Sequence, residues 1–447
     1  MKRFISALCA LTIMLTSAAS AVTLPETTAG YVILVETTSG RILFEHNADE
    51  PAYPASLTKI MTVMLALENL DLDQVLTVSN TALQNLSPYG SHARPRLIEY
   101  EQLTVRNLLY SAMLVSANEA CNVLAEAVAG SVEAFVDMMN ARAREIGANN
   151  TNFTNAHGLH DIAQVTTARD MYLITMEARR LPMFLQMAYT EIHELPPTNM
   201  HDQSRVWVNT NALIRRQHNH RPEAFYAPAR GVKTGFTTPA GHCLVSLATL
   251  GGLEQLLVVM DAGLTDENVG RHFFESRRLL EWGFSNFERR ELVNRGRPII
   301  SQEIAAGHNA GDIVLVTQDN FEDVMPNDFD PDDLIFRPVI DQDVGQRNRA
   351  GVLIAPVERN DVFGHVEIWD GEELLGTILL IANASVERAA GAYFSMRLSE
   401  FWEAYGTWLI VGIIALFALL IFYIIVTILY NKRRRREMTR GAWATDR

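Results

Sequence analysis

Cysteine is scarce in this sequence, and its scarcity excludes two classes of protein. Only three cysteines occur among 447 residues, and neither a C-x-x-C pair nor an H-E-x-x-H motif is present. A disulfide-dense scaffold and a structural zinc site both need more bridging or ligating residues than this. We therefore expect Cys121 and Cys243 to be buried free thiols, with a single bridge between them as the alternative. His157 and His160 lack a third ligand at metal-binding spacing, so we expect structural histidines, no metal and no cofactor.

Positive charge is also in short supply. The chain has 38 Lys and Arg against 52 Asp and Glu, a formal net charge of −14. Seven of the basic residues follow Tyr430, so the rest of the chain is more acidic still. Such a surface repels nucleic-acid phosphates, and we expect no nucleic-acid partner. The acidic segment 328–333 lacks the glycine and terminal glutamate of a dedicated calcium loop, so a solvated turn is the preferred interpretation.

The N-terminus carries the pattern of a secretory signal. Lys2 and Arg3 precede an uncharged apolar run over residues 4–15, and small residues follow up to Ala21. This order is typical of a signal peptide, and we expect cleavage after Ala21. An uncleaved anchor is the alternative, but the run is shorter than the roughly 20 apolar residues that span a membrane.

A second apolar segment lies near the C-terminus, where residues 407–430 contain no charge. At about 1.5 Å per residue this segment exceeds the roughly 30 Å of a hydrocarbon core. Five basic residues follow at 432–436, and basic residues stay on the cytoplasmic side. The sequence therefore predicts a single-pass protein of the cell membrane, with its main part on the extracytoplasmic side.

Between these ends, the apolar pattern predicts an α/β (α+β) domain. Residues 31–46 and 242–260 each contain two apolar runs joined by a glycine-containing turn, which is typical of a hairpin. Residues 57–70 are apolar nearly all round, which indicates a buried helix. The simplest assembly is an antiparallel sheet from both ends of the domain with a helical lobe inserted. Other helices are expected at 105–114, 118–129, 132–146, 167–177 and 271–282, the last ending at a Gly283 cap.

Beyond this domain, short apolar runs alternate with turns such as Asp370-Gly371. That pattern predicts a small all-β domain, and no internal repeat is evident. We divide the chain into a signal peptide (1–21), a catalytic domain (22–288), a small β-sandwich domain (289–386), a membrane-proximal helix or linker (387–406), a transmembrane helix (407–430) and a basic cytoplasmic tail (431–447).

Ser56 and Lys59 are the first candidates for chemistry. They stand three residues apart at the start of the predicted buried helix, so the hydroxyl and the amine share one helix face. Burial lowers the pKa of a lysine, and a neutral amine can take the serine proton. The spacing alone is weak evidence, because a capping serine followed by a surface lysine has the same pattern.

Two further motifs strengthen this interpretation. Ser116 and Asn118 follow an apolar segment and open the next predicted helix, where a loop presents polar groups to a cleft. Lys233-Thr234-Gly235 precedes the second hairpin. A strand edge with a lysine and a hydroxyl can hold a carboxylate, while glycine lets a substrate approach closely. Taken separately, the two motifs are as typical of a helix cap and a turn.

The three motifs stand in the chain order of serine penicillin-recognising enzymes: S-x-x-K, S-x-N and K-T-G. Over about residues 28–286 the sequence resembles the D-alanyl-D-alanine carboxypeptidases, the low-molecular-mass penicillin-binding proteins. The segments that carry the resemblance are PASLTKIMT (54–62), SANEAC (116–121), HGL (157–159), GVKTGFT (231–237) and LLEWGF (279–284). The resemblance implies a DD-peptidase/serine β-lactamase-like fold. It also implies a peptidoglycan stem peptide ending in D-Ala-D-Ala as substrate, and β-lactams as covalent inhibitors.

The resemblance also implies roles for individual residues. Ser56 would be the nucleophile that forms an acyl-enzyme, and Lys59 the base. Ser116 would relay protons to the leaving D-Ala and help to activate water for deacylation. Asn118 would hydrogen-bond the substrate amide. The terminal carboxylate would be bound by Lys233 and Thr234 of the K-T-G motif, which ends at Gly235, with Arg271 as a less certain helper.

Two departures from the family pattern affect this assignment. The oxyanion hole would use the backbone N–H groups of Ser56 and Phe236, but some relatives carry histidine where Phe236 stands, so recognition by that side chain is in doubt. Segment 97–104 lacks a Pro-Gly turn common in relatives, so cleft dynamics and deacylation could differ.

Three alternatives stay open at this point. A β-lactamase of the same fold would carry an E-x-x-L-N segment between the second and third motifs, and none is present. A DD-endopeptidase acting on cross-links has the same motifs. A non-catalytic penicillin or cell-wall sensor is disfavoured because the tail is too short for an effector domain and all catalytic positions are filled.

Overall fold

The computed structural model describes residues 23–88, 90–216, 222–264, 270–308 and 311–442. The predicted signal peptide (1–21) with its cleavage position lies outside these residues. The chain forms two compact units. One contains the residues up to Arg290 together with Asp323–Phe329, and the other contains Glu291–Glu322 and the chain from Asp330 onward. The sequence did not indicate that Asp323–Phe329 belongs with the first unit.

The first unit is built on a five-stranded sheet of order β2-β1-β9-β8-β7. Every neighbouring pair is antiparallel. The predicted antiparallel sheet, drawn from both ends of the domain, is thereby confirmed. Its strands are β1 (Tyr31–Glu36), β2 (Ile42–His46), β7 (Ala229–Thr237), β8 (Gly241–Leu250) and β9 (Leu253–Ala262).

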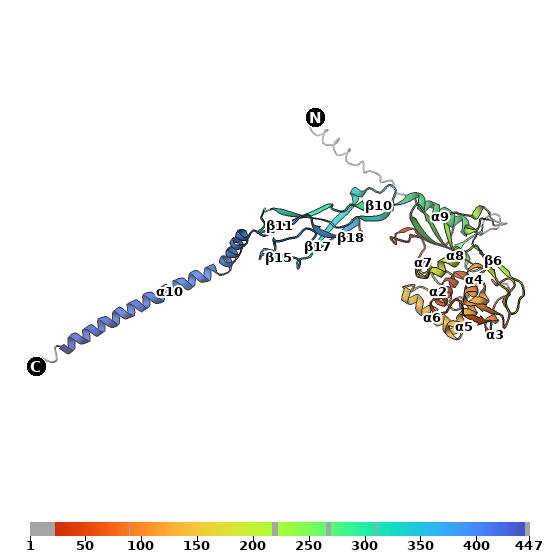
Figure 1. The fold of residues 1–447 in the computed structure, drawn as a ribbon, viewed down its shortest axis with the longest axis horizontal. Helices are drawn as coiled ribbons and strands as arrows, with labels where there is room; N and C mark the ends of the chain where they lie inside the picture. The colour runs from red at the N-terminus through yellow and green to blue at the C-terminus, as the bar shows by residue number, and fades with distance from the viewer. Residues whose placement is uncertain (1–22, 89, 217–221, 265–269, 309–310, 443–447) are drawn as a thin grey trace, which may run out of the picture. The chain divides into compact units, whose positions relative to one another are not determined.

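A helical lobe lies between the two hairpins in sequence, as predicted (Figure 1). Its first segment is a one-turn 3-10 helix, η1 (Ala55–Thr58), that leads into α2 (Lys59–Asn69), whose first eight residues are all buried. The other helices are α3 (Asn80–Leu83), α4 (Val105–Leu114), α5 (Asn118–Ala129), α6 (Val132–Ile146), α7 (Ala168–Ala178) and α8 (Pro182–Tyr189). Short elements complete the lobe and its connections: β3 (Val75–Thr77), β4 (Gln102–Thr104), β5 (Ile192–Leu195), β6 (Arg205–Val208), η2 (Ala212–Ile214) and η3 (Pro222–Ala224).

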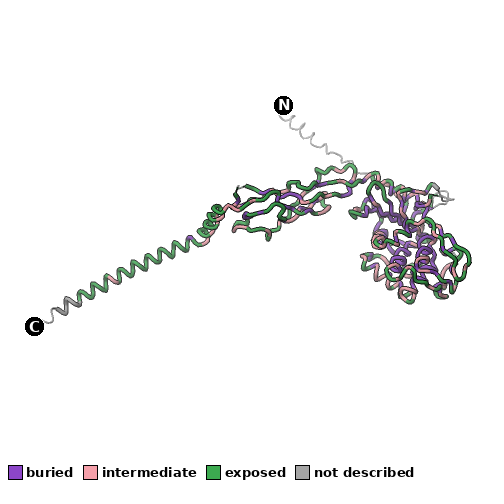
Figure 2. The backbone as a smooth tube through the Cα atoms, in the orientation of Figure 1, coloured by how far each residue is buried: buried purple, intermediate pink, exposed green. Residues whose placement is uncertain are grey.

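Alternation along the strands gives the sheet a hydrophobic core on each face. Ile33 and Val35 of β1 belong to the cluster shared with the helical lobe. Val32 and Leu34 belong to a second cluster on the opposite face, which α9 (His272–Asn286) covers with residues such as Leu280. Figure 2 shows the sheet and the inner helices as the main buried region of this unit.

The predicted end of α9 at Gly283 is wrong. The helix continues to Asn286, and Gly283 lies inside it. A Cβ at this position would stand 2.6 Å from Oε1 of Gln255, a buried residue of β9. Gly283 therefore allows the helix to pack closely on the sheet and does not serve as a cap.

The second unit contains a seven-stranded sheet of order β14-β17-β18-β12-β11-β16-β15. The predicted turn at Asp370-Gly371 joins β17 to β18, which pair antiparallel. In the acidic segment, the Asp330 side chain accepts a hydrogen bond from Asp332 N–H and so caps the short η4 helix. From Phe287 onward the elements are β10 (Phe287–Val293), β11 (Pro298–Ala305), β12 (Asp312–Thr317), β13 (Phe321–Pro326), η4 (Pro331–Asp333), β14 (Ile335–Ile340), β15 (Gln346–Arg347), β16 (Leu353–Ile354), β17 (Val362–Asp370) and β18 (Glu373–Ala382), and the residues of β10 and β13 are divided between the two units.

The C-terminal helix α10 (Ala390–Ala442) contains the predicted membrane-proximal segment from residue 390 onward and the whole predicted span, and it continues into the predicted cytoplasmic tail. Among the described residues it is the one helix long and apolar enough to cross a membrane. Its side chains over the apolar part are exposed rather than packed on protein (Figure 2). An exposed apolar surface of this length is typical of a helix surrounded by lipid.

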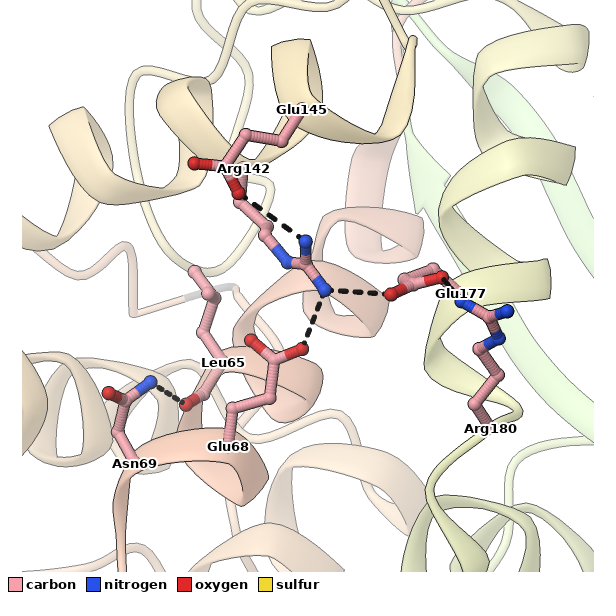
Figure 3. A network of polar contacts seen from close by, with 7 residues as sticks. All are labelled: Leu65, Glu68, Asn69, Arg142, Glu145, Glu177 and Arg180. Carbon is pink, nitrogen blue, oxygen red and sulfur yellow. Dashed lines mark hydrogen bonds and ion pairs between the residues drawn. The ribbon is translucent and has the colours of Figure 1, made fainter.

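Arg142 of α6 joins three helices of the lobe (Figure 3). Its guanidinium lies 3.0 Å from Glu68 of α2, 2.8 Å from Glu177 of α7 and 3.4 Å from Glu145 of its own helix. Arg180 contacts Glu177 from the solvent side, with 75% of its side chain exposed against 25% for Arg142. Arg142 is therefore the central cation of this cluster.

We predict that Arg142→Met lowers the unfolding temperature of the first unit by about 2–4 °C, because partly buried carboxylates lose their shared partner at a cost of about 1 kcal/mol. Arg180→Met is the matched control and should shift the midpoint by less than about 1 °C, since exposed pairs contribute little. Thermal unfolding followed by circular dichroism measures both. Equal shifts for the two variants would contradict the central role of Arg142.

Candidate active site

Ser56 lies in η1, directly before α2. The sequence predicted one continuous buried helix here, but the first turn is 3-10, with Leu57 N–H donating to the Pro54 carbonyl at 3.1 Å. The Thr58 hydroxyl donates to the Ala55 carbonyl at 2.8 Å and fixes the turn. The turn presents Ser56 to a cleft while the residues on either side of it stay buried.

Lys59 lies beneath Ser56 with no exposed surface. Its Nζ donates to Ser56 Oγ at 2.9 Å and to Asn118 Oδ1 at 2.9 Å, and it also donates to the backbone carbonyl of His157. Burial lowers the pKa of Lys59 to about 8, although Cys121 and Glu119 act in the opposite direction. A substantial fraction of this amine is therefore neutral near pH 7 to 8, and it is in contact with the serine hydroxyl.

Ser116 stands between α4 and α5 in a left-handed backbone conformation, with φ of +61°. It is 4% exposed and lines the cleft. Within the described residues its Oγ has no hydrogen-bond partner. Strain in a non-glycine residue and an unsatisfied hydroxyl are both typical of functional sites. The arrangement leaves a hydroxyl available for a bound ligand.

The K-T-G segment forms part of β7. Lys233 is buried, and its Nζ donates a hydrogen bond to the Thr234 carbonyl at 3.1 Å. Burial, together with the charge of Lys59, lowers the pKa of Lys233 well below the usual value. Thr234 Oγ1 lies 2.7 Å from Thr210 Oγ1. A Cβ on Gly235 would stand 3.2 Å from the Ser56 nitrogen. The strand therefore runs directly beside Ser56.

The cleft has a volume of about 410 Å³. Six of the nine predicted site residues line it, namely Ser56, Ser116, Asn118, Thr234, Gly235 and Phe236. Lys59 and Lys233 are buried behind this surface. Arg271 is not among the described lining residues; it is the N-cap residue of α9, next to His272 and Phe273, which do line the cleft. Its proposed contact with a carboxylate stays a prediction.

The Phe236 side chain belongs to a stack of rings that the sequence did not predict. It is 56% exposed and stacks on His242 with ring centroids 4.5 Å apart. His242 lies parallel to His272 at 4.9 Å, and His272 contacts Phe273 at 3.9 Å. A Cβ on Gly270 would stand 2.6 Å from His272 Nδ1, so glycine is needed there for the stack to form. These rings form one aromatic wall of the cleft.

Several other functional groups also lacked a clear signal in the sequence. The carbonyl of His157 that binds Lys59 is a backbone group, and no residue type encodes it. Burial and the charge of Lys59 lower the pKa of His157 to about 3, so its ring is neutral.

Cys121 and Cys243 are buried free thiols, as expected.

Comparisons with known proteins agree with this geometry. The profile of a family described as D-alanyl-D-alanine carboxypeptidase matches residues 18–263. D-alanyl-D-alanine carboxypeptidase DacA of Haemophilus influenzae is 34% identical over 64% of this chain and 69% of its own length. The D-alanyl-D-alanine endopeptidase of Escherichia coli is 30% identical over 60% of this chain and 81% of its length. The crystal structure of penicillin binding protein 5 from Haemophilus influenzae is similar with a TM-score of 0.60 and 29% identity, covering 82% of this chain and 100% of that one.

We predict that Gly158→Ala severely disturbs the Ser56 turn. Gly158 has φ of +88°, and a Cβ there would lie 1.9 Å from the Ala55 carbonyl oxygen. Gly130→Ala is the matched control, since its φ is +82° and a Cβ would meet nothing within 4 Å. The control should lose only the roughly 1 kcal/mol of left-handed strain. Thermal unfolding should show a clearly larger loss for Gly158→Ala, and equal losses would disprove the steric argument.

Proposed function

We propose that Ser56 is the nucleophile and Lys59 the general base of this chain, which belongs to the D-alanyl-D-alanine carboxypeptidase family. The protein is a serine-type D-Ala-D-Ala carboxypeptidase. The substrate that we propose is the peptidoglycan stem peptide, with β-lactams as covalent inhibitors. The observation that carries the assignment is the 2.9 Å contact between the fully buried Lys59 amine and Ser56 Oγ.

Acylation begins when neutral Lys59 accepts the Ser56 proton while Oγ bonds to the carbonyl carbon of the penultimate D-Ala. The backbone N–H groups of Ser56 and Phe236 would stabilise the oxyanion, because both lie on the cleft and Gly235 brings β7 against Ser56. When the tetrahedral intermediate collapses, the C–N bond to the terminal D-Ala breaks. Ser116, whose hydroxyl lacks a partner among the described residues, would pass its proton to the leaving amine and regain one from protonated Lys59, which becomes neutral again.

Substrate binding would involve both sides of the cleft. Asn118, which accepts a hydrogen bond from Lys59 through Oδ1, would bind the substrate amide. The Thr234 hydroxyl and the Lys233 amine would engage the terminal carboxylate. Deacylation reverses the proton path: Lys59 and Ser116 activate a water that attacks the ester carbonyl and returns the proton to Ser56.

The protein is anchored to the membrane by α10, which is long and apolar enough to span it. We further propose a single pass with the basic residues that follow the span on the cytoplasmic side. This orientation would place Ser56 outside the cell membrane, where peptidoglycan is found. Modification of an introduced cysteine at an exposed ectodomain position by an impermeant thiol reagent in whole cells would test the orientation.

Endopeptidase action on D-Ala-containing cross-links is a second candidate, favoured by the similarity to the Escherichia coli endopeptidase. Both reactions use the same acyl-enzyme, and they differ only in the amine that leaves. Incubating the protein with a D-Ala-D-Ala peptide and with a cross-linked muropeptide dimer separates them. Release of D-Ala with little cleavage of the dimer supports carboxypeptidase action.

We predict that Ser56→Ala abolishes both D-Ala release and labelling by a fluorescent penicillin, because the ester bond cannot form. The variant should still fold and lose no more than about 2–4 °C in unfolding temperature, because Lys59 loses one acceptor but keeps its contacts with Asn118 and the His157 carbonyl. Ser87→Ala, which alters another serine of the cleft lining, serves as the matched control and should still be labelled. Labelling of Ser56→Ala at the wild-type rate would exclude Ser56 as the nucleophile.

We predict that the rate of penicillin labelling rises with pH through an apparent pKa near 8. Lys59 acts as a base only when neutral, and burial lowers its pKa from 10.5 to about 8, so the reactive fraction grows about tenfold per pH unit below 8 and then levels off. Lys59→Arg, which cannot lose its proton in this range, should be inactive at every pH. A rate that keeps rising to pH 10 would contradict the role of Lys59.

A further inference from the structure

The second unit contains a pocket of about 400 Å³ that takes part in no step described above. Its floor is formed by the neighbouring strands β18, β12 and β11, and its rim by the turn before β11 and the loop before β17. All of its lining residues belong to this one unit. The volume is in the range of pockets that bind small ligands, about 300–1,000 Å³. We call it the arginine pocket, after Arg295 and Arg359 on its rim.

The two arginines give the pocket a positive charge. Both are exposed, and the described lining contains neither aspartate nor glutamate. Within the described residues neither guanidinium makes a hydrogen bond or an ion pair. By contrast, the other arginines between residues 291 and 400 each contact a protein group through the side chain; they are Arg297, Arg337, Arg347, Arg349, Arg388 and Arg397. In a chain with a net charge of −14, two such cations at one pocket favour an anionic ligand.

The turn that carries Arg295 is held in place by Thr317, a fully buried residue of the pocket lining. The Thr317 hydroxyl donates to the Asn294 carbonyl at 2.8 Å and accepts a hydrogen bond from the Arg297 N–H at 3.0 Å. The backbone on both sides of Arg295 is therefore fixed to β12. Such fixing lowers the entropic cost of binding a ligand.

The loop that carries Arg359 is also pinned through its backbone. The Arg359 N–H donates to Ser385 Oγ at 2.9 Å, and the Asn360 N–H donates to the Ala382 carbonyl at 3.0 Å. Both sides of the rim are thus ordered by bonds within the unit, while the two guanidinium groups point to no protein partner among the described residues.

The floor of the pocket is largely apolar. Val316 and Ile381, which are 9% and 5% exposed, form part of it. Asn360 and Asn383 also line the pocket, and within the described residues their side-chain amides make no hydrogen bond. Apolar surface accommodates methyl groups, and free amides can pair with the N–H and C=O groups of a peptide. Guanidinium groups match the fork geometry of a carboxylate. Together these groups suit a short peptide that has small side chains and a free carboxylate.

We propose that the arginine pocket is a second, non-catalytic site that binds the carboxylate end of peptidoglycan stem peptides. The choice of ligand rests on the proposed function, because a D-Ala terminus supplies both the carboxylate and a small methyl group. A bare phosphate would match the charge and leave the apolar floor unused. One peptidoglycan polymer carries many stem peptides, so holding one of them in the arginine pocket raises the effective concentration of the others at Ser56.

Binding to insoluble peptidoglycan tests the site directly. The full-length protein in detergent is kept with excess benzylpenicillin, so that the cleft is occupied, and is sedimented with purified sacculi. Nα-acetyl-L-Lys-D-Ala should displace the protein from the sacculi. Its C-terminal carboxamide should compete at least fivefold more weakly at equal ionic strength, because it lacks the carboxylate charge.

A double variant locates the binding. Arg295→Met with Arg359→Met should weaken sacculus binding about fivefold, since each exposed charge contact contributes modestly. Arg337→Met with Arg349→Met removes the same charge from exposed positions of the same unit that do not line the pocket, and this control should bind as the wild type does. Asn383→Asp places a negative charge at an exposed position of the lining. It should also weaken binding, and it provides the test if the double variant unfolds.

Activity gives an independent measurement in the absence of penicillin. The Arg295→Met, Arg359→Met variant should release D-Ala about fivefold more slowly from limiting amounts of sacculi that retain pentapeptides. Its rate on soluble Nα,Nε-diacetyl-L-Lys-D-Ala-D-Ala should be unchanged, because a single short peptide gains nothing from a second binding site.

The outcomes separate this inference from the proposed function. Sacculus binding that survives the double variant, or a carboxamide that competes as well as the acid, would overturn the arginine pocket as a peptide site. Displacement by inorganic phosphate at lower concentration than by the acid peptide would overturn it in favour of a phosphate site. In these cases D-Ala release from the soluble peptide would still support the carboxypeptidase. Failure of the wild type to release D-Ala would overturn the proposed function itself, whatever the penicillin-blocked protein binds.

Discussion

A lysine amine held out of water is the constraint on which the active site depends. Lys59 is fully buried, and its three hydrogen-bond acceptors come from η1, from α5 and from the segment before Gly158. A buried charge without partners is strongly destabilising, so these three segments must close together around the amine. The contacts of one amine therefore join three segments that are far apart in the sequence. The same burial lowers the pKa of Lys59 to about 8, as its proposed role as a base requires.

Where local signals were strong, the sequence predicted the fold well. The β1–β2 and β8–β9 hairpins formed as expected because apolar runs and glycine turns are encoded by adjacent residues. The helices at 105–114 and 118–129 have the predicted bounds, and Thr104 caps the first of them. Ser56, Ser116 and Thr234 meet at one cleft because their motifs lie where the lobe joins the sheet. The order of the three motifs along the chain was enough to predict that these residues come together in one site.

What the sequence missed depends on packing between distant segments. The Phe236–His242–His272 stack joins three elements, and no spacing along the chain indicates it. Gly283 resembled a cap, but it lies inside α9, and glycine is needed there because Gln255, far away in sequence, packs against it. The 3-10 turn at Ser56 depends on contacts with Gly158 and Gly235. At these positions the local conformation depends on contacts with residues that are distant in the sequence, and such contacts override local propensity.

The two glycines against the Ser56 turn have a consequence for antibiotic resistance. A side chain at Gly158 or Gly235 would push on the backbone of Ala55 or Ser56, and so would displace Ser56, the proposed nucleophile. In the proposed mechanism, the peptide substrate and a β-lactam both react with the Ser56 oxygen, so such changes should impair peptide cleavage and drug binding together. A variant that excludes the drug while still accepting peptide must therefore alter the outer parts of the cleft, where the two molecules differ in shape.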